Sequence, residues 1–429
     1  MDNPARRSRA EGERRRELDE LPIRVGTPED WDAVSRLLFT AFNDTFDEEQ
    51  SRVERGIYEP DRTLLTVDGD DIVGIGAAFT RDLTVPGAVM PTAHVTMVSV
   101  SPTHRRRGLL RNTMTRQLTE VRAAGQEPIA ALWASEGRIY QRYGYGLATA
   151  RVGFDIDARE VRLTDPPAGE QAGGRIRSVE ATAVLTELAK VYEQLRVDRP
   201  GWSSRDDRWW AYHLADLPAR RHGSTEARTI VHEGPSGVDG YALWRVKNSW
   251  DAGGPNGEVI VNELLATNPT AYVQLWRFLL SVDLTRSARY WSGSVDEPLL
   301  YLANEPRRLG ARLADGLWVR VVDVGAALSA RRYAAPVDVV LDVTDDLLTE
   351  NSGRWRLVAD ASGAGRCTRT DAEPDLAFDV SVLGAAYLGG ASLGSLAAAG
   401  RVTELRAGAL GPATAALGWY RPPSAIEVF

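Results

Sequence analysis

The stretch that decides the fold lies at residues 98–111 and reads V-S-V-S-P-T-H-R-R-R-G-L-L-R. It begins as a short β-type run, and three arginines and a glycine follow before an apolar-periodic segment starts. In that segment Leu110, Met114, Leu118 and Val121 recur at spacings of four, four and three, which predicts a helix with one buried stripe. The sequence therefore predicts a strand, a basic loop and a helix in direct succession.

The loop has the properties of an anion site. Cations are disfavoured at the N-terminus of a helix unless an anion is bound there, and successive backbone N–H groups at a loop-to-helix junction bind phosphate groups. Arg105, Arg106 and Arg107 add charge, and Gly108 lacks the Cβ that would keep a ligand from the backbone. The junction predicts a site for a phosphorylated cofactor, and an ordinary basic surface loop is the alternative that this motif leaves open.

A second motif follows downstream. Residues 129–134 read I-A-A-L-W-A, a continuous apolar run that suits a strand buried on both faces beside a parallel neighbour. Ser135 can cap the short helical turn that comes next, and Gly144 is placed to end it. The two motifs together predict a β-loop-α-β unit.

The spacing Arg105-x-x-Gly108-x-Leu110 resembles the acetyl-CoA loop of the GCN5-related N-acetyltransferases (GNAT), with Leu110 in place of the usual small residue. Residues 102–111, 134–137 (A-S-E-G) and 139–146 (I-Y-Q-R-Y-G-Y-G), with a C-terminal phenylalanine, look like the actinobacterial enhanced intracellular survival (Eis) acetyltransferases. The likeness covers nearly the whole chain. It implies an α+β fold with two tandem GNAT-type mixed-sheet domains, a C-terminal α/β domain like sterol carrier proteins, and a homohexamer.

The expected domain boundaries follow from composition and from this resemblance. Residues 1–21 carry dense mixed charge and predict a disordered extension, and 22–165 form the catalytic GNAT domain. Its first helix should start at Thr27 and bury one face, and its strands are expected near 63–67, 72–79 and 93–100. The residues expected on that helix face are Trp31, Val34, Leu38, Ala41 and Phe42.

A Pro/Gly-rich linker at 164–174 separates this domain from the next. Within 175–322, residues 259–280 parallel 93–114 as a strand, a Pro-Thr pair and an amphipathic helix, but without the arginines and the glycine. We expect a second, degenerate GNAT-like domain there. Residues 323–429 are expected to form the sterol-carrier-like domain, as a lipid-binding groove or, as we prefer, a packing and assembly domain.

Bulk composition describes a soluble globular protein. The chain has 429 residues with 43% hydrophobic and 26% charged residues, and its net charge of −8 argues against non-specific nucleic-acid binding. We expect no membrane span, because no apolar run approaches about 18 residues. The charged N-terminus and the single cysteine, Cys367, predict a cytoplasmic location. The histidines lack metal-ligand spacing, so we expect no metal.

The resemblance implies that acetyl-CoA is the co-substrate and that three segments bind it. The strand at Val98, Ser99 and Val100 would pair with the pantetheine amides like an added strand. Ser135 and Glu136 would lie on the far side of the pantetheine arm. The pyrophosphate would be held by Arg106, Arg107, Gly108, Leu109, Leu110 and Arg111.

The resemblance also implies the two catalytic groups. Tyr140 matches the position whose phenol, with an ordinary pKa near ~10, protonates the departing CoA sulfur; from the residues alone, Tyr143 and Tyr145 compete with it. The C-terminal carboxylate of Phe429 would take the proton of the amine, with help from burial or a water relay, since such groups titrate near ~3.5. His94 and His104 are alternative bases, for which we prefer structural roles.

For the acceptor, Asp44 falls where the resemblance implies an acidic residue that contacts cationic substrates, and Trp133 is expected to form a wall of the same cavity. The acid expected just before the last residue is absent, because Val428 precedes Phe429 and Glu427 lies one place earlier. We predict acetylation of amines of polycationic, aminoglycoside-like acceptors or of lysine side chains, and small arylalkyl amines stay open. The alternative is a non-catalytic CoA- or lipid-binding protein that uses the sterol-carrier-like domain.

Overall fold

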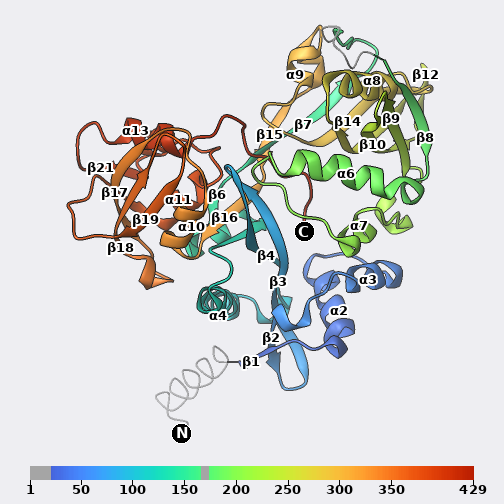
Figure 1. Cartoon of the computed structure of the whole chain (residues 1–429). Coiled ribbons are helices and arrows are strands. Elements are labelled where there is room, and N and C mark those ends of the chain that lie inside the picture. The colour runs from blue at the N-terminus through green and yellow to red at the C-terminus, as the bar shows by residue number, and fades with distance from the viewer. Residues whose placement is uncertain (1–20, 166–172) are drawn as a thin grey trace.

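The computed structural model describes residues 21–165 and 173–429. Residues 1–20 of the expected extension and most of the linker expected at 164–174 lie outside these residues. Figure 1 shows three bodies: a blue-to-teal one, a green-to-gold one and an orange-to-red one, and the C-terminus lies where the first two meet. None of the helices within the described ranges is long and apolar enough to cross a membrane.

The first domain is built on a seven-stranded mixed sheet with strand order β1-β2-β3-β4-β5-β16-β6. Strands β1 to β4 are antiparallel neighbours, whereas β5 lies parallel to β4. The mixed sheet expected from the sequence is confirmed. Its strands are β1 (Ile23–Val25), β2 (Thr63–Asp68), β3 (Asp71–Val85), β4 (Ala88–Val100), β5 (Ile129–Trp133), β6 (Gly146–Leu147) and β16 (Leu317–Val321), and its helices are α2 (Trp31–Ala41), α3 (Glu48–Arg55), α4 (Leu109–Ala124) and α5 (Gly137–Tyr140).

Two helices show how the apolar pattern places this domain's core. The predicted stripe of α4 is confirmed, since Met114, Leu118 and Val121 are buried and the helix packs on β2, β3 and β4. Helix α2 likewise buries Trp31 and Val34. Phe42, expected on the same buried face, is instead 55% exposed, because α2 ends at Ala41 and the chain turns away there.

Strands β4 and β5 separate part-way along their length. They pair only from Thr92 to His94, opposite residues 129–131, so the remainder of β4 has no neighbour on that edge. A bulge lies in the separated part: the register with β3 skips residues 97 and 98, and Met97 adopts a left-handed φ of +52°. Because β4 and β5 diverge, one edge of β4 is unpaired beyond His94, and the bulge at residues 97 and 98 lies in this unpaired part.

The second domain repeats this topology. Its sheet has the order β8-β9-β10-β13-β14-β7-β15, with antiparallel pairs up to β13 and a parallel pair β13-β14 joined through α8. The internal repeat inferred from 259–280 is therefore confirmed. The strands are β7 (Ala150–Asp157), β8 (Arg175–Val179), β9 (Arg228–Gly234), β10 (Gly237–Lys247), β13 (Gly257–Ala266), β14 (Thr285–Gly293) and β15 (Arg312–Asp315), and the main helices are α6 (Leu185–Arg196), α7 (Asp207–His213) and α8 (Pro269–Leu280).

The two sheets exchange strands. β7 follows the first domain in the chain but lies in the second sheet, between β14 and β15. β16 follows the second domain in the chain but lies in the first sheet, antiparallel to both β5 and β6. Each sheet thus contains one strand from outside the continuous segment that forms the rest of it. This strand exchange fixes the two domains to each other.

The third domain packs against the first. Helix α11 approaches the first sheet so closely that a Cβ on Gly146 would lie 2.0 Å from the carbonyl oxygen of Ser381. One hydrophobic core runs through both domains, from Ile129 and Val319 to Val339 and Leu383. The domain comprises α10 (Val324–Ala330), β17 (Val337–Thr344), β18 (Gly353–Ala359), β19 (Gly365–Arg369), β20 (Leu376–Asp379), α11 (Val380–Ala386), α12 (Leu393–Ala398), β21 (Val402–Glu404) and α13 (Leu410–Leu417).

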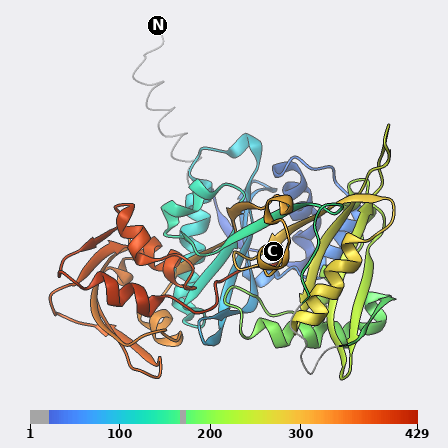
Figure 2. The same ribbon diagram turned by 90° about the horizontal axis from the view of Figure 1, so that it is seen from above.

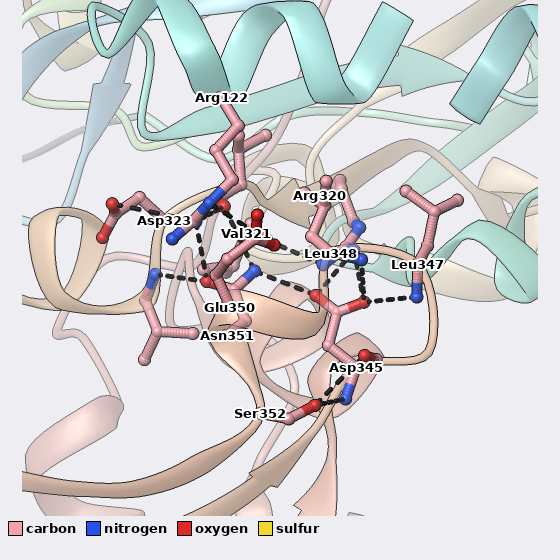
Figure 3. A network of polar contacts seen from close by, with 12 residues as sticks. Arg122, Arg320, Val321, Asp323, Asp345, Leu347, Leu348, Glu350, Asn351 and Ser352 are labelled. Atoms are coloured by element: carbon pink, nitrogen blue, oxygen red, sulfur yellow. Dashed lines mark hydrogen bonds and ion pairs between the residues drawn. The ribbon is translucent and has the colours of Figure 1, made fainter. Parts of the chain in front are cut away.

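A buried polar network crosses the same junction (Figure 3). Arg320 of β16 donates from Nη2 to both carboxylate oxygens of Asp345, each at 2.7 Å, and both side chains are almost completely buried. Asn351 donates to Asp345 at 2.9 Å and accepts from Arg122, near the end of α4, at 3.0 Å. The helix that follows the basic loop is therefore connected to the third domain through hydrogen bonds as well as apolar packing.

Candidate active site

A pocket of about 480 Å³ lies in the first domain, where β4 and β5 have separated. It is mainly apolar, and its walls come from α2, α3, β4, β5, α5, the second domain and the last two residues of the chain. The side chains that line it are Leu38, Phe39, Phe42, Asp44, Gln50, Glu54, Ile57, Phe79, Val95, Thr96, Met97, Val98, Trp133, Ala134, Ser135, Tyr140, Tyr212, Val428 and Phe429. Segments far apart in sequence thus converge on one cavity.

The basic loop that follows β4 has the backbone features of an anion site. Arg106 and Gly108 both have left-handed backbone, with φ of +64° and +84°, and α4 starts directly after Gly108. No side chain caps the first turn of α4, and no acidic residue lies in it. The free N–H groups of the turn and the helix dipole remain available for a ligand.

The arginines of this loop have no carboxylate partner within residues 21–165 and 173–429. Arg106, Arg107 and Arg111 form no ion pair with any carboxylate in the described part of the chain, and Arg105 donates only to the main-chain oxygens of Ala41 and Val100. The second domain offers a contrast. There the Asn268 side chain caps α8, accepting from the N–H of Ala271 at 2.9 Å, with Pro269 in the first turn. Of these two corresponding helices, α8 is capped by a side chain and α4 is not.

The strand residues of the expected cofactor site lie along the free edge of β4. Val98 belongs to the bulge and lines the pocket, while Ser99 and Val100 pair with β3 on the opposite edge. Across the cleft Ser135 lines the pocket, whereas Glu136 is exposed and forms an ion pair with Arg138 at 3.1 Å. Leu109 is buried in the first turn of α4 and Leu110 is half-buried. The cleft therefore has an unpaired strand edge on the side where pantetheine amides could pair.

Tyr140 is the one tyrosine of its segment that lines the pocket; Tyr143 and Tyr145 do not. Tyr145 lies behind it in the core, with its ring centroid 6.0 Å from that of Tyr140. Burial, with smaller contributions from Tyr143 and Glu136, raises the pKa of Tyr140 to about 12. The phenol is therefore a protonated donor at any physiological pH.

The chain end is also part of the pocket. Val428 and Phe429 line it, and the Phe429 ring packs 4.6 Å from the ring of His94, centroid to centroid. His94 is fully buried between the carbonyl oxygen of Thr92, at 2.9 Å, and the hydroxyl of Ser203, at 2.8 Å. Burial and Arg81 lower the pKa of His94 to about 3, so it stays neutral. This is a structural role, in which the His94 ring supports the last residue.

A charged cluster fastens the segment just before the chain end. Glu427 pairs with Arg81 of β3 and, at 2.7 Å, with Arg205 of the second domain. Arg205 is fully buried, forms two hydrogen bonds with Glu263, and lies over the ring of Tyr192. Burial alone would raise the pKa of Glu427, but Arg81 and Arg205 lower it to about 2. Glu427 is therefore an ionised anchor that both GNAT-like domains hold.

Asp44 and Trp133, the residues expected to bind the acceptor, both line the pocket. Sequence reasoning missed Gln50, Glu54 and Tyr212. Gln50 and Glu54 lie on α3, a helix that is not among those expected from the sequence. Tyr212 comes from the second domain, and no local pattern indicates that it reaches the first. His104 hydrogen-bonds Asp68 at 3.1 Å on an exposed loop and does not line the pocket.

Comparisons with known proteins identify these domains. Residues 22–148 and 201–321 each match a family described as an acetyltransferase (GNAT) domain, and residues 324–425 match a sterol carrier protein domain. An N-acetyltransferase of Streptomyces avermitilis is 44% identical over 92% of this chain and 96% of its own length. The N-acetyltransferase Eis of Mycobacterium tuberculosis is 36% identical over 88% of this chain and 91% of its own.

The chain belongs to the Eis family of GNAT N-acetyltransferases. The solved structure of Eis1 from Mycobacterium abscessus matches with a TM-score of 0.81 and 31% identity, covering 95% of this chain and all of that one. The expected architecture of two GNAT domains and one sterol-carrier-type domain is thus confirmed. GNAT enzymes use acetyl-CoA. The uncapped helix turn, the open edge of β4 and the loop arginines, which form no ion pair with any described carboxylate, fit that co-substrate.

Proposed function

We propose that the protein transfers the acetyl group of acetyl-CoA directly to an amine, with Tyr140 as general acid and the Phe429 carboxylate as base. One observation carries the proposal: Tyr140, the chain end and the bulged edge of β4 line the same cavity. Direct transfer needs these three parts together, as a proton donor for the thiolate, a proton acceptor for the amine and a hydrogen-bond donor for the thioester oxygen.

Three segments would bind acetyl-CoA. Arg106, Arg107, Gly108, Leu109, Leu110 and Arg111 would hold the pyrophosphate with backbone N–H groups and guanidinium groups. Val98, Ser99 and Val100 would pair with the pantetheine amides along the free edge of β4, and Ser135 with Glu136 would close the opposite side. The acyl carbonyl would then lie at the bulge, where an N–H that is not used in the β3-β4 ladder can stabilise negative charge on its oxygen.

The proton transfers balance between two residues. The Phe429 carboxylate accepts a proton from the ammonium form of the acceptor, so that the free amine can attack the acyl carbon. As the carbon–sulfur bond breaks, the Tyr140 hydroxyl gives its proton to sulfur and CoA leaves as the thiol. Support for the base comes from its surroundings: no cation of residues 21–165 or 173–429 forms an ion pair with the chain-end carboxylate.

Asp44 and Trp133 would bind the acceptor, Asp44 through its charge and Trp133 as an apolar wall. Polycationic, aminoglycoside-like molecules and lysine side chains are the acceptor classes that the family resemblance favours. The same resemblance supports a homohexamer, and the single cysteine supports a cytoplasmic location. Size-exclusion chromatography with light scattering measures the molar mass in solution. A homohexamer should have six times the mass of one chain.

Thiol release from acetyl-CoA in the presence of a panel of amines tests the proposed activity. We expect saturable, amine-dependent release with at least one acceptor, and mass spectrometry should find one added acetyl group for each thiol released. An absence of release across the panel would contradict the proposal. If the protein then carried one lipid per chain, that result would favour the non-catalytic alternative.

A further inference from the structure

The first two residues of the basic loop are hydrogen-bonded to neighbouring elements. His104 bonds to Asp68, at the end of β2, at 3.1 Å. Arg105 donates from Nη2 to the carbonyl oxygen of Ala41 at 3.0 Å and from Nε to that of Val100 at 3.3 Å. Ala41 is the last residue of α2, and Val100 is the last residue of β4. The Arg105 side chain therefore connects the loop to the end of α2, whereas the proposed cofactor contacts begin only at the next residue.

The carbonyl group that Arg105 binds is one that α2 does not satisfy by itself. This helix ends in a Schellman motif, in which Asn43 has a left-handed φ of +58°. The N–H groups of Asn43 and Asp44 donate back into the last turn at 3.3 and 2.8 Å, and neither of them uses the carbonyl of Ala41. The last turn of α2 also contains no basic residue, so Arg105 supplies the cation that the C-terminal end of a helix favours.

The end of α2 is also a wall of the pocket. Leu38, Phe39, Phe42 and Asp44 line it. Phe42 and Asp44 are exposed and lie in the segment between α2 and α3, outside both helices. Asp44 is the residue proposed to bind the acceptor. The hydrogen bond from Arg105 thus joins the loop proposed for the cofactor to the segment proposed for the acceptor.

We infer that Arg105 is a positioning residue through which bound acetyl-CoA strengthens the binding of the acceptor. The inference rests on the proposed function. When the cofactor occupies the loop, the loop loses conformational freedom and holds the Arg105 guanidinium at the end of α2. The segment that carries Phe42 and Asp44 is then ordered before the acceptor arrives, so the acceptor loses less conformational entropy when it binds. By thermodynamic linkage, the acceptor raises the affinity for acetyl-CoA by the same factor.

Hydrogen–deuterium exchange of the full chain tests this connection without any acceptor. CoA is the probe, at a concentration that isothermal titration shows to be saturating. We expect CoA to slow the exchange of amides 42–44 at least about threefold in the wild type and less than about 1.5-fold in Arg105→Gln. Equal slowing in the two proteins, or no slowing in the wild type, would overturn the inference and leave the proposed function intact. An absence of CoA binding would instead contradict the proposed function and remove the inference with it.

Steady-state kinetics separate this role from direct binding of phosphate. For Arg105→Gln at saturating acetyl-CoA, we expect the KM of the acceptor to rise about fivefold while kcat, and the Kd of CoA alone, stay within about twofold. Electrostatics alone predicts the opposite sign, because removal of a positive charge would favour a cationic amine and weaken the binding of the anionic cofactor. A weaker Kd for CoA with an unchanged acceptor KM would overturn the inference.

His104→Ala is the matched control in the same loop. It breaks the hydrogen bond to Asp68, and neither of these residues lines the pocket. We expect the acceptor KM of His104→Ala to stay within about twofold of the wild type, because the contact between Arg105 and α2 is kept. A rise in acceptor KM equal to that of Arg105→Gln would show that any loosening of the loop has this effect, and would overturn the role assigned to Arg105.

Discussion

Tyr140 gains its proposed role from where its hydroxyl is placed, not from the tyrosine-rich sequence around it. Three tyrosines occur within six residues, and from the sequence alone any of them could be the acid. The structure separates them, because Tyr140 lines the pocket while Tyr145 is fully buried in the core. Burial keeps the proton on the Tyr140 phenol, so the proposed donor is present at neutral pH when the thiolate leaves.

Replacing this hydroxyl tests that role. Tyr140→Phe removes the proton donor and keeps the ring, so we expect kcat to fall by about 10²-fold or more, with unchanged binding of acetyl-CoA. Thiol release and isothermal titration measure the two quantities. Tyr143→Phe is the matched control, since Tyr143 is buried but does not line the pocket. Wild-type turnover in Tyr140→Phe would exclude the phenol as the acid.

The raised pKa of Tyr140 also predicts a pH profile. An ordinary phenol is half ionised near pH ~10, whereas one with a pKa of about 12 remains protonated there. Activity that needs the protonated form should therefore persist to pH 10 and decline only above it. Measurement of kcat from pH 7 to 10.5, with stability checked by circular dichroism, tests this. A loss of half the activity by pH 10 in folded protein would contradict it.

The other pocket residues show which parts of the site can be predicted from the sequence and which cannot. Val98, Ser135, Tyr140 and Phe429 were predicted because they belong to motifs or to the chain end, and the structure brings all four to one cavity. Glu54 was not predicted, and it pairs with Arg220, which lies 166 residues away in the chain. Such a contact follows from how the two GNAT-like domains pack, and no local pattern encodes it.

At the scale of elements, β3 shows how a buried charged residue can make a strand look shorter in the sequence than it is. The alternation of apolar residues predicts a strand at 72–79, but β3 runs to Val85. The missed part contains Arg81 and Asp82, and charged residues ordinarily indicate that a strand has ended. Arg81 is nevertheless buried, because it pairs with Glu427 and lies over the ring of Trp209. The strand continues because the chain's last segment supplies the counter-ion.

The same pair makes the anchoring of the C-terminal segment dependent on pH. The pKa of Glu427 is lowered to about 2 in the folded protein, from an ordinary value of 4.5. Its contribution to stability is therefore complete above pH ~4.5 and is lost as the pH falls toward ~2. We expect the free energy of unfolding of Glu427→Gln to fall less than that of the wild type between pH 5 and 3. Urea titrations at each pH measure this.

A matched substitution of an exposed acidic residue controls for the effect of low pH on the rest of the protein. Glu120 pairs with Arg116 on the surface of α4, and both side chains are at least one-third exposed, so Glu120→Gln should follow the wild-type pH dependence. The anchoring role of Glu427 would be refuted if Glu427→Gln lost stability with pH as steeply as the wild type.

For the whole molecule, the family resemblance predicted three domains, yet it did not reveal how they are joined. Strands β7 and β16 exchange between the two GNAT-type sheets, and β16 also carries Arg320 into the junction with the third domain. Periodicity identifies a strand, but nothing in it specifies which sheet the strand joins. In Figure 2, as in Figure 1, the chain end lies between the first and second domains, which is how the last residue of the third reaches the pocket of the first.

The junction seen in Figure 3 should therefore be important for stability. Asp345→Asn leaves the buried Arg320 guanidinium without a counter-charge, and we expect a loss of about 3–5 kcal/mol in the free energy of unfolding. Asp338→Asn is the control, because Asp338 and Arg356 are each 52% exposed and solvent screens such a pair, so we expect a much smaller effect. Urea denaturation measures both. Equal effects would show that the buried pair does not hold the domains together.

The central claim is that the last carboxylate of the chain acts in the first domain's pocket, and converting that group to an amide tests it most directly. Intein-mediated ligation can produce the full chain ending in Phe429 with either a free carboxylate or a carboxamide. Thiol release in the presence of an accepted amine should then be slower by about 10²-fold or more for the carboxamide, with unchanged affinity for acetyl-CoA. Equal turnover of the two proteins would contradict the account.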